Sequence, residues 1–98
     1  MNHRFQQIIN SSKPVLVDFY ADWCGPCKEI QPVLKQVKQE VKGVRVVKVN
    51  VDENPIIASR YNVNSLPTLM VFKDGVPIWT HEGMFCIEKL KSILQTGM

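Results

Sequence analysis

Short apolar runs alternate along the chain with longer segments in which apolar residues recur every three or four positions. The first of two such runs, Val15–Tyr20, is interrupted by a single acid. The second, Val44–Val51, is interrupted mainly by bases. Runs of this kind are typical of central strands covered on both faces. Between them, the apolar residues of Ile30–Val41 keep helical spacing, and Pro32 predicts a kink in that helix. The pattern predicts two parallel strands joined by a right-handed helical crossover.

Two shorter helices are predicted on either side of this unit. Helical spacing over residues 5–12 predicts an amphipathic helix that ends at the Lys13-Pro14 breaker. A second helix is predicted over Ile56–Tyr61, with Asn54 as its N-cap and proline at its first position. Asn62 follows it, and asparagine tolerates the left-handed conformation common at helix ends.

The last third of the chain predicts a hairpin and a closing helix. Thr68–Phe72 and Val76–Trp79 flank the tight turn Lys73–Gly75, which favours an antiparallel pair. Pro77 cannot donate a backbone hydrogen bond, so the second strand is expected at a sheet edge or to begin there. Helical spacing over residues 87–94 completes an α/β fold: a mixed central sheet of about four strands, flanked by helices on both faces.

Composition indicates one globular domain, residues 1–98. The chain is 45% hydrophobic and 21% charged, and its length supports one core but not two. A net charge of +3 is too small to indicate nucleic-acid binding. Neither a signal-peptide-like run nor a transmembrane run is found in the sequence. We therefore expect a cytoplasmic monomer that binds neither nucleic acid nor membrane.

The three cysteines suggest redox chemistry more than structural cross-linking, since stapled secreted domains usually have even counts. Cys24 and Cys27 lie where the first strand ends and the long helix begins, close enough to bridge each other. Pro26 is permitted between them because first-turn amides have no intrahelical acceptor. These amides and the helix dipole favour an anion, so the thiolate of Cys24 is expected to be stabilised. A thiolate is the nucleophile in disulfide exchange.

Zinc binding is the main alternative, because Cys-x-x-Cys is also the spacing of zinc knuckles. Two further ligands would be needed, and the candidates His3, His81 and Cys86 have no second paired spacing. Redox use is therefore the preferred interpretation. A binding module that uses the same surface without chemistry is a further alternative.

The motifs around the cysteine pair resemble those of the thioredoxin family across nearly the whole chain. The matching residues are Val17–Lys28, Pro32, Lys48, Val51–Pro55, Leu66–Thr68, Phe72–Gly75 and Gly83. The resemblance implies a thioredoxin fold and a protein-disulfide reductase without a bound cofactor. Disulfide-containing proteins would be its targets, and thioredoxin reductase would return the pair to the dithiol. Disulfide oxidases and isomerases use the same fold and pair, but the Gly25-Pro26 dipeptide resembles the reducing members.

In the expected mechanism Cys24 attacks the substrate disulfide, and Cys27 resolves the mixed disulfide. Asp18 lies inside an apolar strand, where burial should raise its pKa. The resemblance implies that Asp18 and Lys48 meet behind the cysteine pair, with the lysine charge partly opposing that rise. Asp18 is the candidate general base for Cys27, and a purely structural ion pair is the alternative.

The resemblance also implies a substrate groove beside the cysteines. Pro67 should follow a cis bond and face the pair, with the backbone of Leu66 turned outward to receive an extended substrate segment. The expected lining residues around Cys24 are Trp23, Gly25, Pro26, Leu66, Pro67 and Gly83.

Two features depart from the family pattern. The usual initial edge strand is not found, which would make Val44–Val51 an edge protected by Arg45 and Lys48. Cys86 lies where the last helix should begin. It is expected to be a small, half-buried residue, with a reactive or dimer-forming thiol as the alternative.

Overall fold

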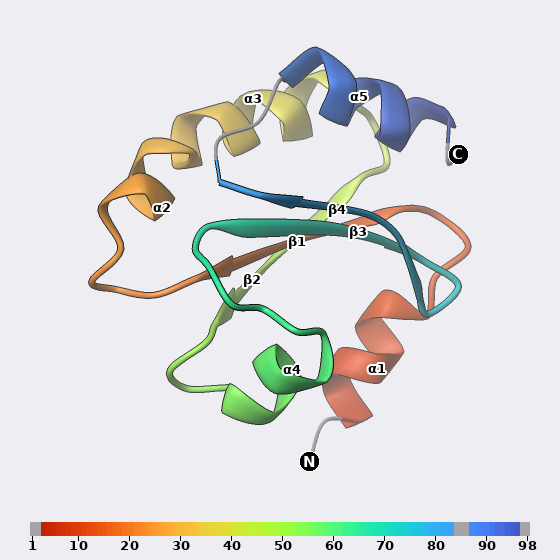
Figure 1. The fold of residues 1–98 in the computed structure, drawn as a ribbon. Coiled ribbons are helices and arrows are strands. Elements are labelled where there is room, and N and C mark those ends of the chain that lie inside the picture. The colour runs from red at the N-terminus through yellow and green to blue at the C-terminus, as the bar shows by residue number, and fades with distance from the viewer. Residues whose placement is uncertain (1–2, 84–86, 97–98) are drawn as a thin grey trace.

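The alternating strand and helix patterns produce a mixed sheet between two helical layers (Figure 1). A computed structural model describes residues 3–83 and 87–96. The strands are β1 (Val15–Tyr20), β2 (Arg45–Asn50), β3 (Thr68–Lys73) and β4 (Val76–Glu82), in the spatial order β2-β1-β3-β4. β1 pairs in parallel with β2, and antiparallel pairs join β1 to β3 and β3 to β4. The predicted crossover and hairpin are confirmed.

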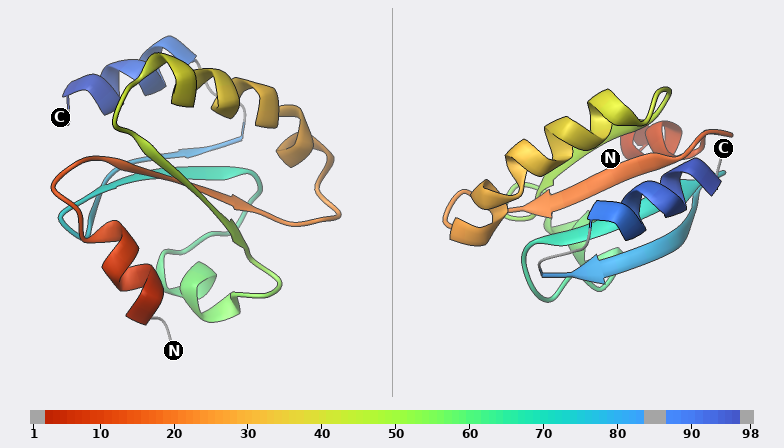
Figure 2. Two further views of the ribbon diagram at one scale, coloured as in Figure 1. Left: turned by 180° about the vertical axis from the view of Figure 1, so that it is seen from behind. Right: turned by 90° about the horizontal axis from the view of Figure 1, so that it is seen from above.

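Helices cover both faces of this sheet (Figure 2). One layer contains α1 (His3–Ile9) and α4 (Pro55–Arg60), and the other contains α2 (Gly25–Glu29), α3 (Gln31–Glu40) and α5 (Ile87–Thr96). Side chains alternate along β1 between the two layers. Leu16 packs into the core beneath α3 and α5, whereas Val17 and Phe19 pack into the core against α1 and α4. Asp18 has the same parity as Leu16 and therefore lies on the α3 side.

The long helix after the cysteines is divided in two at Ile30. This residue is the C-cap of α2 and the N-cap of α3, and Pro32 lies in the first turn of α3. A proline is tolerated in a first turn because it lacks only an amide that would have no partner there. The kink predicted at Pro32 is thus a break, and it allows Gln31 to begin a new helix beside the cysteine pair.

The ends of α4 agree with the sequence only in part. Asn62 is left-handed, with a φ of 56°, as its position predicted. Asn54 is the N-cap residue, but its side chain makes no capping hydrogen bond. Its side-chain amide instead donates to the backbone carbonyl of Asn50 at 3.0 Å. The predicted position of the N-cap is therefore confirmed, while the Asn54 side chain stabilises the turn that follows β2.

β2 and β4 form the two edges of the described sheet. Arg45 and Lys48 on β2 are exposed, as expected for an edge that resists pairing with another chain. Pro77 lies on β4 opposite Phe72, next to an irregularity in the pairing. Its missing amide is tolerated there, as predicted.

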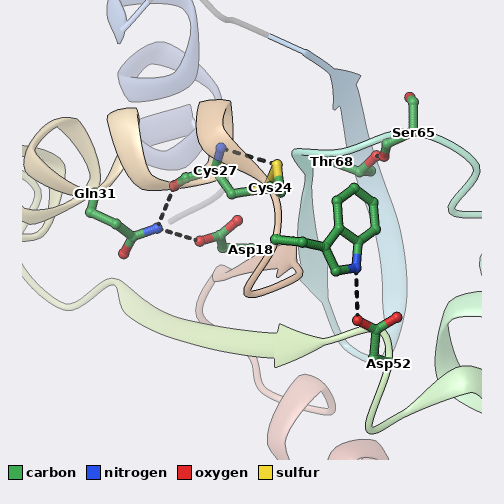
Figure 3. Close-up of a disulfide and its surroundings, with 8 residues drawn as sticks. Asp18, Cys24, Cys27, Gln31, Asp52, Ser65 and Thr68 are labelled. Atoms are coloured by element: carbon green, nitrogen blue, oxygen red, sulfur yellow. Dashed lines mark hydrogen bonds between the residues drawn. A yellow bond between two sulfur atoms is a disulfide. The ribbon is translucent and has the colours of Figure 1, made fainter.

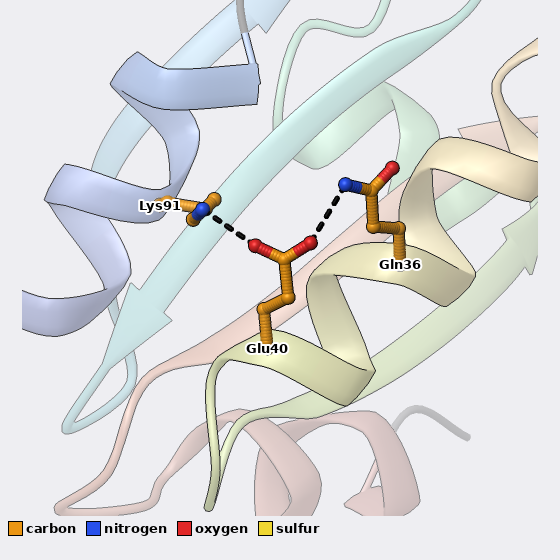
Figure 4. Close-up of polar contacts among 3 residues, drawn as sticks. All are labelled: Gln36, Glu40 and Lys91. Atoms are coloured by element: carbon orange, nitrogen blue, oxygen red, sulfur yellow. Dashed lines mark hydrogen bonds and ion pairs between the residues drawn. The ribbon is translucent and has the colours of Figure 1, made fainter.

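Interlayer contacts complete the framework. Phe5, Tyr61 and Phe72 join α1, the end of α4 and β3, with ring centroids 5.1 to 6.0 Å apart. On the other side, Lys91 of α5 donates to Glu40 of α3, which also accepts from Gln36 (Figure 4). Within residues 3–83 and 87–96, none of the helices has the length and apolar character needed to cross a membrane. The prediction for Cys86 lies outside the described residues.

Candidate redox site

The cysteine pair lies at the junction of β1 and α2. Cys24 is the N-cap of α2, and Cys27 lies in its first turn, so one turn of helix separates them. The two form a disulfide, with their Cα atoms 5.3 Å apart, within the range that a disulfide requires. The Sγ atom of Cys24 accepts a hydrogen bond of 3.2 Å from the amide of Cys27 (Figure 3). The helix start therefore directs a backbone donor at the sulfur expected to carry negative charge.

Both cysteines are buried in this disulfide form. Cys24 is 4% exposed and Cys27 is 2% exposed. They pack with Ala21, and Leu66 and Tyr20 lie against this cluster. These neighbours and the bond between the two sulfurs cover both residues.

Asp18 is fully buried on the α3 side of β1. Its Oδ2 atom accepts a hydrogen bond of 3.0 Å from the side-chain amide of Gln31. Its Oδ1 atom is buried without a hydrogen-bond partner. Burial raises the pKa of Asp18, opposed by the hydrogen bond from Gln31 and by the charge of Lys48. The strand thus holds, behind the cysteine pair (Figure 3), an acid that keeps its proton to a higher pH than an exposed aspartate does.

Lys48 lies opposite Asp18 in the parallel register of β1 and β2. Its ammonium nevertheless lies 4.9 Å from the centre of the Tyr20 ring, and the two side chains do not form an ion pair. The expected meeting of Asp18 and Lys48 is therefore wrong at the level of direct contact. A lysine stem can follow an apolar surface while its charge stays in water and over an aromatic ring. Lys48 acts on Asp18 only through its charge.

Of the residues expected to line the groove, Leu66 packs against the cysteine cluster. Trp23 is 72% exposed, and its indole nitrogen donates to Oδ2 of Asp52 at 2.9 Å (Figure 3). Gly25 and Pro26 are also exposed. The bond between Leu66 and Pro67 is cis. The amide of Gly83 donates to the Pro67 carbonyl at 2.8 Å.

Two residues of this neighbourhood, Gln31 and Asp52, were not predicted from the sequence. Gln31 is four positions after Cys27, so the two share a helix-like face, and this spacing was the available signal. Asp52 follows β2 at the end of the sheet where β1 also ends, because parallel strands finish at the same edge. That topology could have suggested its approach to Trp23.

A small pocket opens beside the disulfide. Its volume is about 160 Å³, and its lining includes Cys27, Gln31 and Lys48 together with Asp22 and Lys28. Within the described ranges, no three His, Cys, Asp or Glu side chains are grouped closely enough to hold a metal ion. A cysteine pair at a helix start, with a buried acid behind it, is the arrangement that a dithiol–disulfide oxidoreductase uses.

Comparisons with known proteins agree with this class. The family model described as Thioredoxin matches residues 1–96. Thioredoxin 1 of Synechococcus elongatus is 53% identical over 79 residues, which cover 80% of this chain and 74% of the relative. The chain belongs to the thioredoxin family.

Solved structures have the same fold. The oxidised crystal structure of mitochondrial thioredoxin 3 from Saccharomyces cerevisiae superposes with a TM-score of 0.84 at 38% identity, covering 95% of this chain and 87% of that one. A second match has a TM-score of 0.84 at 36% identity and the same coverage. It comes from a study of thiol resolution in yeast mitochondrial 1-Cys peroxiredoxin through the glutathione and thioredoxin systems.

These similarities settle the class of activity. The chain is a thiol–disulfide oxidoreductase of the protein-disulfide reductase type, as its sequence predicted. The oxidase or isomerase interpretation and the zinc module are not favoured by these matches.

Proposed function

We propose that Cys24 is the nucleophile of a two-step reduction of protein disulfides. The Cys24 thiolate attacks one sulfur of the substrate disulfide, a Cys24–substrate bond forms, and the other substrate sulfur leaves as a thiolate. The helix start supports this assignment, because the amide of Cys27 points at the Cys24 sulfur. That contact is the observation that carries the proposal.

Cys27 completes the reaction as the resolving thiol. It gives its proton to Asp18, directly or through water, and the resulting thiolate attacks Cys24. The Cys24–Cys27 bond forms while the Cys24–substrate bond breaks, and the second substrate sulfur leaves and is protonated. Two electrons pass from the pair to the substrate. The position of Asp18 behind the pair (Figure 3) and its raised pKa support this role.

The substrate segment would lie in the groove expected beside the cysteines. The residues that would line it are Trp23, Gly25, Pro26, Leu66, Pro67 and Gly83. Leu66 packs against the cysteine cluster, which brings this segment of the chain beside the cysteine pair. An extended segment could pair with the backbone of Leu66 by strand addition. Trp23 offers an exposed apolar ring beside it.

The partners follow from the electron balance. Each cycle leaves the pair oxidised, so an external reductase must return two electrons, and family membership supports a thioredoxin reductase in that role. Oxidised cysteine proteins are the proposed targets, in line with the peroxiredoxin study of a structural relative. We place this cycle, which carries electrons between proteins, in the cytoplasm, where thiols are kept reduced.

An insulin reduction assay tests the assignment of Cys24. The parent protein should reduce the interchain disulfides of insulin when dithiothreitol regenerates it, and the turbidity of the released chains reports the rate. Cys24→Ser should lower the rate to that of dithiothreitol alone, because no sulfur remains to attack the substrate. A Cys24→Ser protein with parental activity would show that the nucleophile is elsewhere.

A further inference from the structure

The side chain of Gln31 connects the two groups that exchange a proton in the proposed resolving step. Its amide nitrogen donates to Oδ2 of Asp18 at 3.0 Å and to the backbone carbonyl of Cys27 at 3.0 Å. A side-chain amide has two N–H donors, so one group can make both bonds. Figure 3 shows the amide between the acid and the first turn of α2.

We propose that Gln31 is a positioning residue for the resolving step, one that holds the Asp18 carboxylate in register with Cys27. This inference rests on the proposed role of Asp18 as the base. With Oδ2 held by Gln31, the buried and unpartnered Oδ1 is the atom left to receive the proton. The second bond ties the same amide to the peptide of Cys27, so acid and thiol keep a fixed separation.

The break at Ile30 makes this geometry available. Gln31 is the first residue of α3, and its side chain reaches back toward α2. Gln31 is half-buried and lines the pocket that also borders Cys27, whereas Asp18 has no exposed surface. Gln31 therefore lies between the buried acid and the wall of a solvent-accessible pocket.

The charged surroundings of Asp18 define what else can affect its titration. Lys48 faces it from β2, and the side-chain amide of Gln31 donates to it from α3. From β3 its register partner is the apolar Leu69. Asp22 and Lys28 border the neighbouring pocket. The hydrogen bond from Gln31 favours the ionised form of Asp18 more than Lys48 does, so its loss should raise the pKa of Asp18 further.

The first test measures the titration of Asp18 directly and needs no substrate. The side-chain carboxyl carbon of Asp18 is followed by ¹³C NMR during a pH titration of the oxidised protein. Gln31→Leu removes the donor at similar size, and Gln31→Met is a second variant should the branched side chain disturb α3. Gln36→Leu is the matched control, because Gln36 donates to Glu40 on the exposed side of the same helix. The Asp18 midpoint should move to higher pH in the Gln31 variants alone, and a midpoint equal to that of Gln36→Leu would overturn the proposal.

The second test measures the resolving step. A mixed disulfide between reduced protein and a fluorescent peptide is formed by rapid mixing, and peptide release is followed across pH. Gln31→Leu should slow release about threefold or more at mildly acidic pH, within the ~10²-fold that a general base supplies, and the difference should close as pH rises. In an Asp18→Asn background the same substitution should have no further effect.

The outcomes separate the two proposals. If Asp18→Asn leaves the pH profile of release unchanged, the role of Asp18 as base fails and takes the inference with it. If Asp18→Asn alters the profile but Gln31→Leu does not, only the inference about Gln31 is overturned.

Discussion

Asp18 is the residue at which stability and chemistry compete most directly. It is fully buried, and one of its carboxylate oxygens has no partner. A buried carboxylate that lacks full hydrogen bonding destabilises the folded state. A strand that served only the core would carry an apolar residue here, and the retained acid supports a role in proton transfer.

Replacing Asp18 with Asn should therefore stabilise the oxidised protein by about 1–3 kcal/mol at neutral pH, because a neutral amide avoids the desolvation cost of a buried charge. The folded-state pKa is raised above 3.8, so the folded parent binds more protons than the unfolded chain between the two values. Parental stability then falls as pH rises through that interval and stays lower above it.

Urea unfolding at several pH values measures this difference. The stability gain of Asp18→Asn should be small below pH 3.8 and should grow as pH rises through the folded-state pKa of Asp18. Equal unfolding free energies for variant and parent at neutral pH would show that the buried acid carries no cost.

Residue identities alone predicted the cysteine pair, the buried acid and the turn residues, because each depends on local spacing. The contacts of Gln31 and Asp52 depend on tertiary placement. Gln31 reaches Asp18 only because the helix breaks at Ile30. The direct Asp18–Lys48 contact was wrong for a related reason: register fixes the two backbones, but not the direction of a long, exposed side chain.

At the level of elements, the aromatic cluster of Phe5, Tyr61 and Phe72 connects β3 to the layer of α1 and α4. Phe72 is fully buried and contacts both Phe5 and Tyr61 at nearly perpendicular ring angles. Such contacts add to the free energy gained by burying the rings.

Phe72→Ala should lower the free energy of unfolding by about 3–5 kcal/mol, the range for removing a buried phenylalanine. Ile56→Ala on α4 is the control. Its side chain is 60% exposed, so its loss should change stability by no more than about 0.5 kcal/mol. Chemical denaturation of both variants makes the comparison, and similar losses in the two would contradict the assignment of Phe72 to the core.

The edge strand β2 carries a second element-scale prediction. Arg45 is exposed at the start of this edge, where a charge discourages pairing with another molecule. Arg45→Val should increase self-association, measured by sedimentation velocity at rising protein concentration. Parent and variant with equal sedimentation at every concentration would show that Arg45 does not protect the edge.

The strands were the easiest elements to predict, since apolar runs and the turn at Lys73–Gly75 define them without tertiary information. The hairpin and the parallel crossover follow from connection lengths. Pro32 predicted a kink in the long helix but not its complete division at Ile30. The side-chain role of Asn54 was not predictable either, because it depends on a local hydrogen bond to the carbonyl of Asn50.

In the whole molecule, the redox residues lie at one end of the sheet. The core beneath α3 and α5 contains Leu16 and Leu69, the neighbours of Asp18 along and across the sheet. The end of β1 leads directly into the cysteine pair, and α2 begins there. The two cysteines can themselves carry the two electrons exchanged with a partner.

The division of labour between the cysteines is the central claim, and a trapping experiment tests it most directly. Reduced Cys27→Ser is mixed with a disulfide-containing protein and quenched with acid, and the products are mapped by mass spectrometry. A persistent mixed disulfide between Cys24 and the substrate is expected, because no thiol remains to resolve it. Turnover of Cys27→Ser at the parental rate, without such an adduct, would contradict the two-cysteine mechanism.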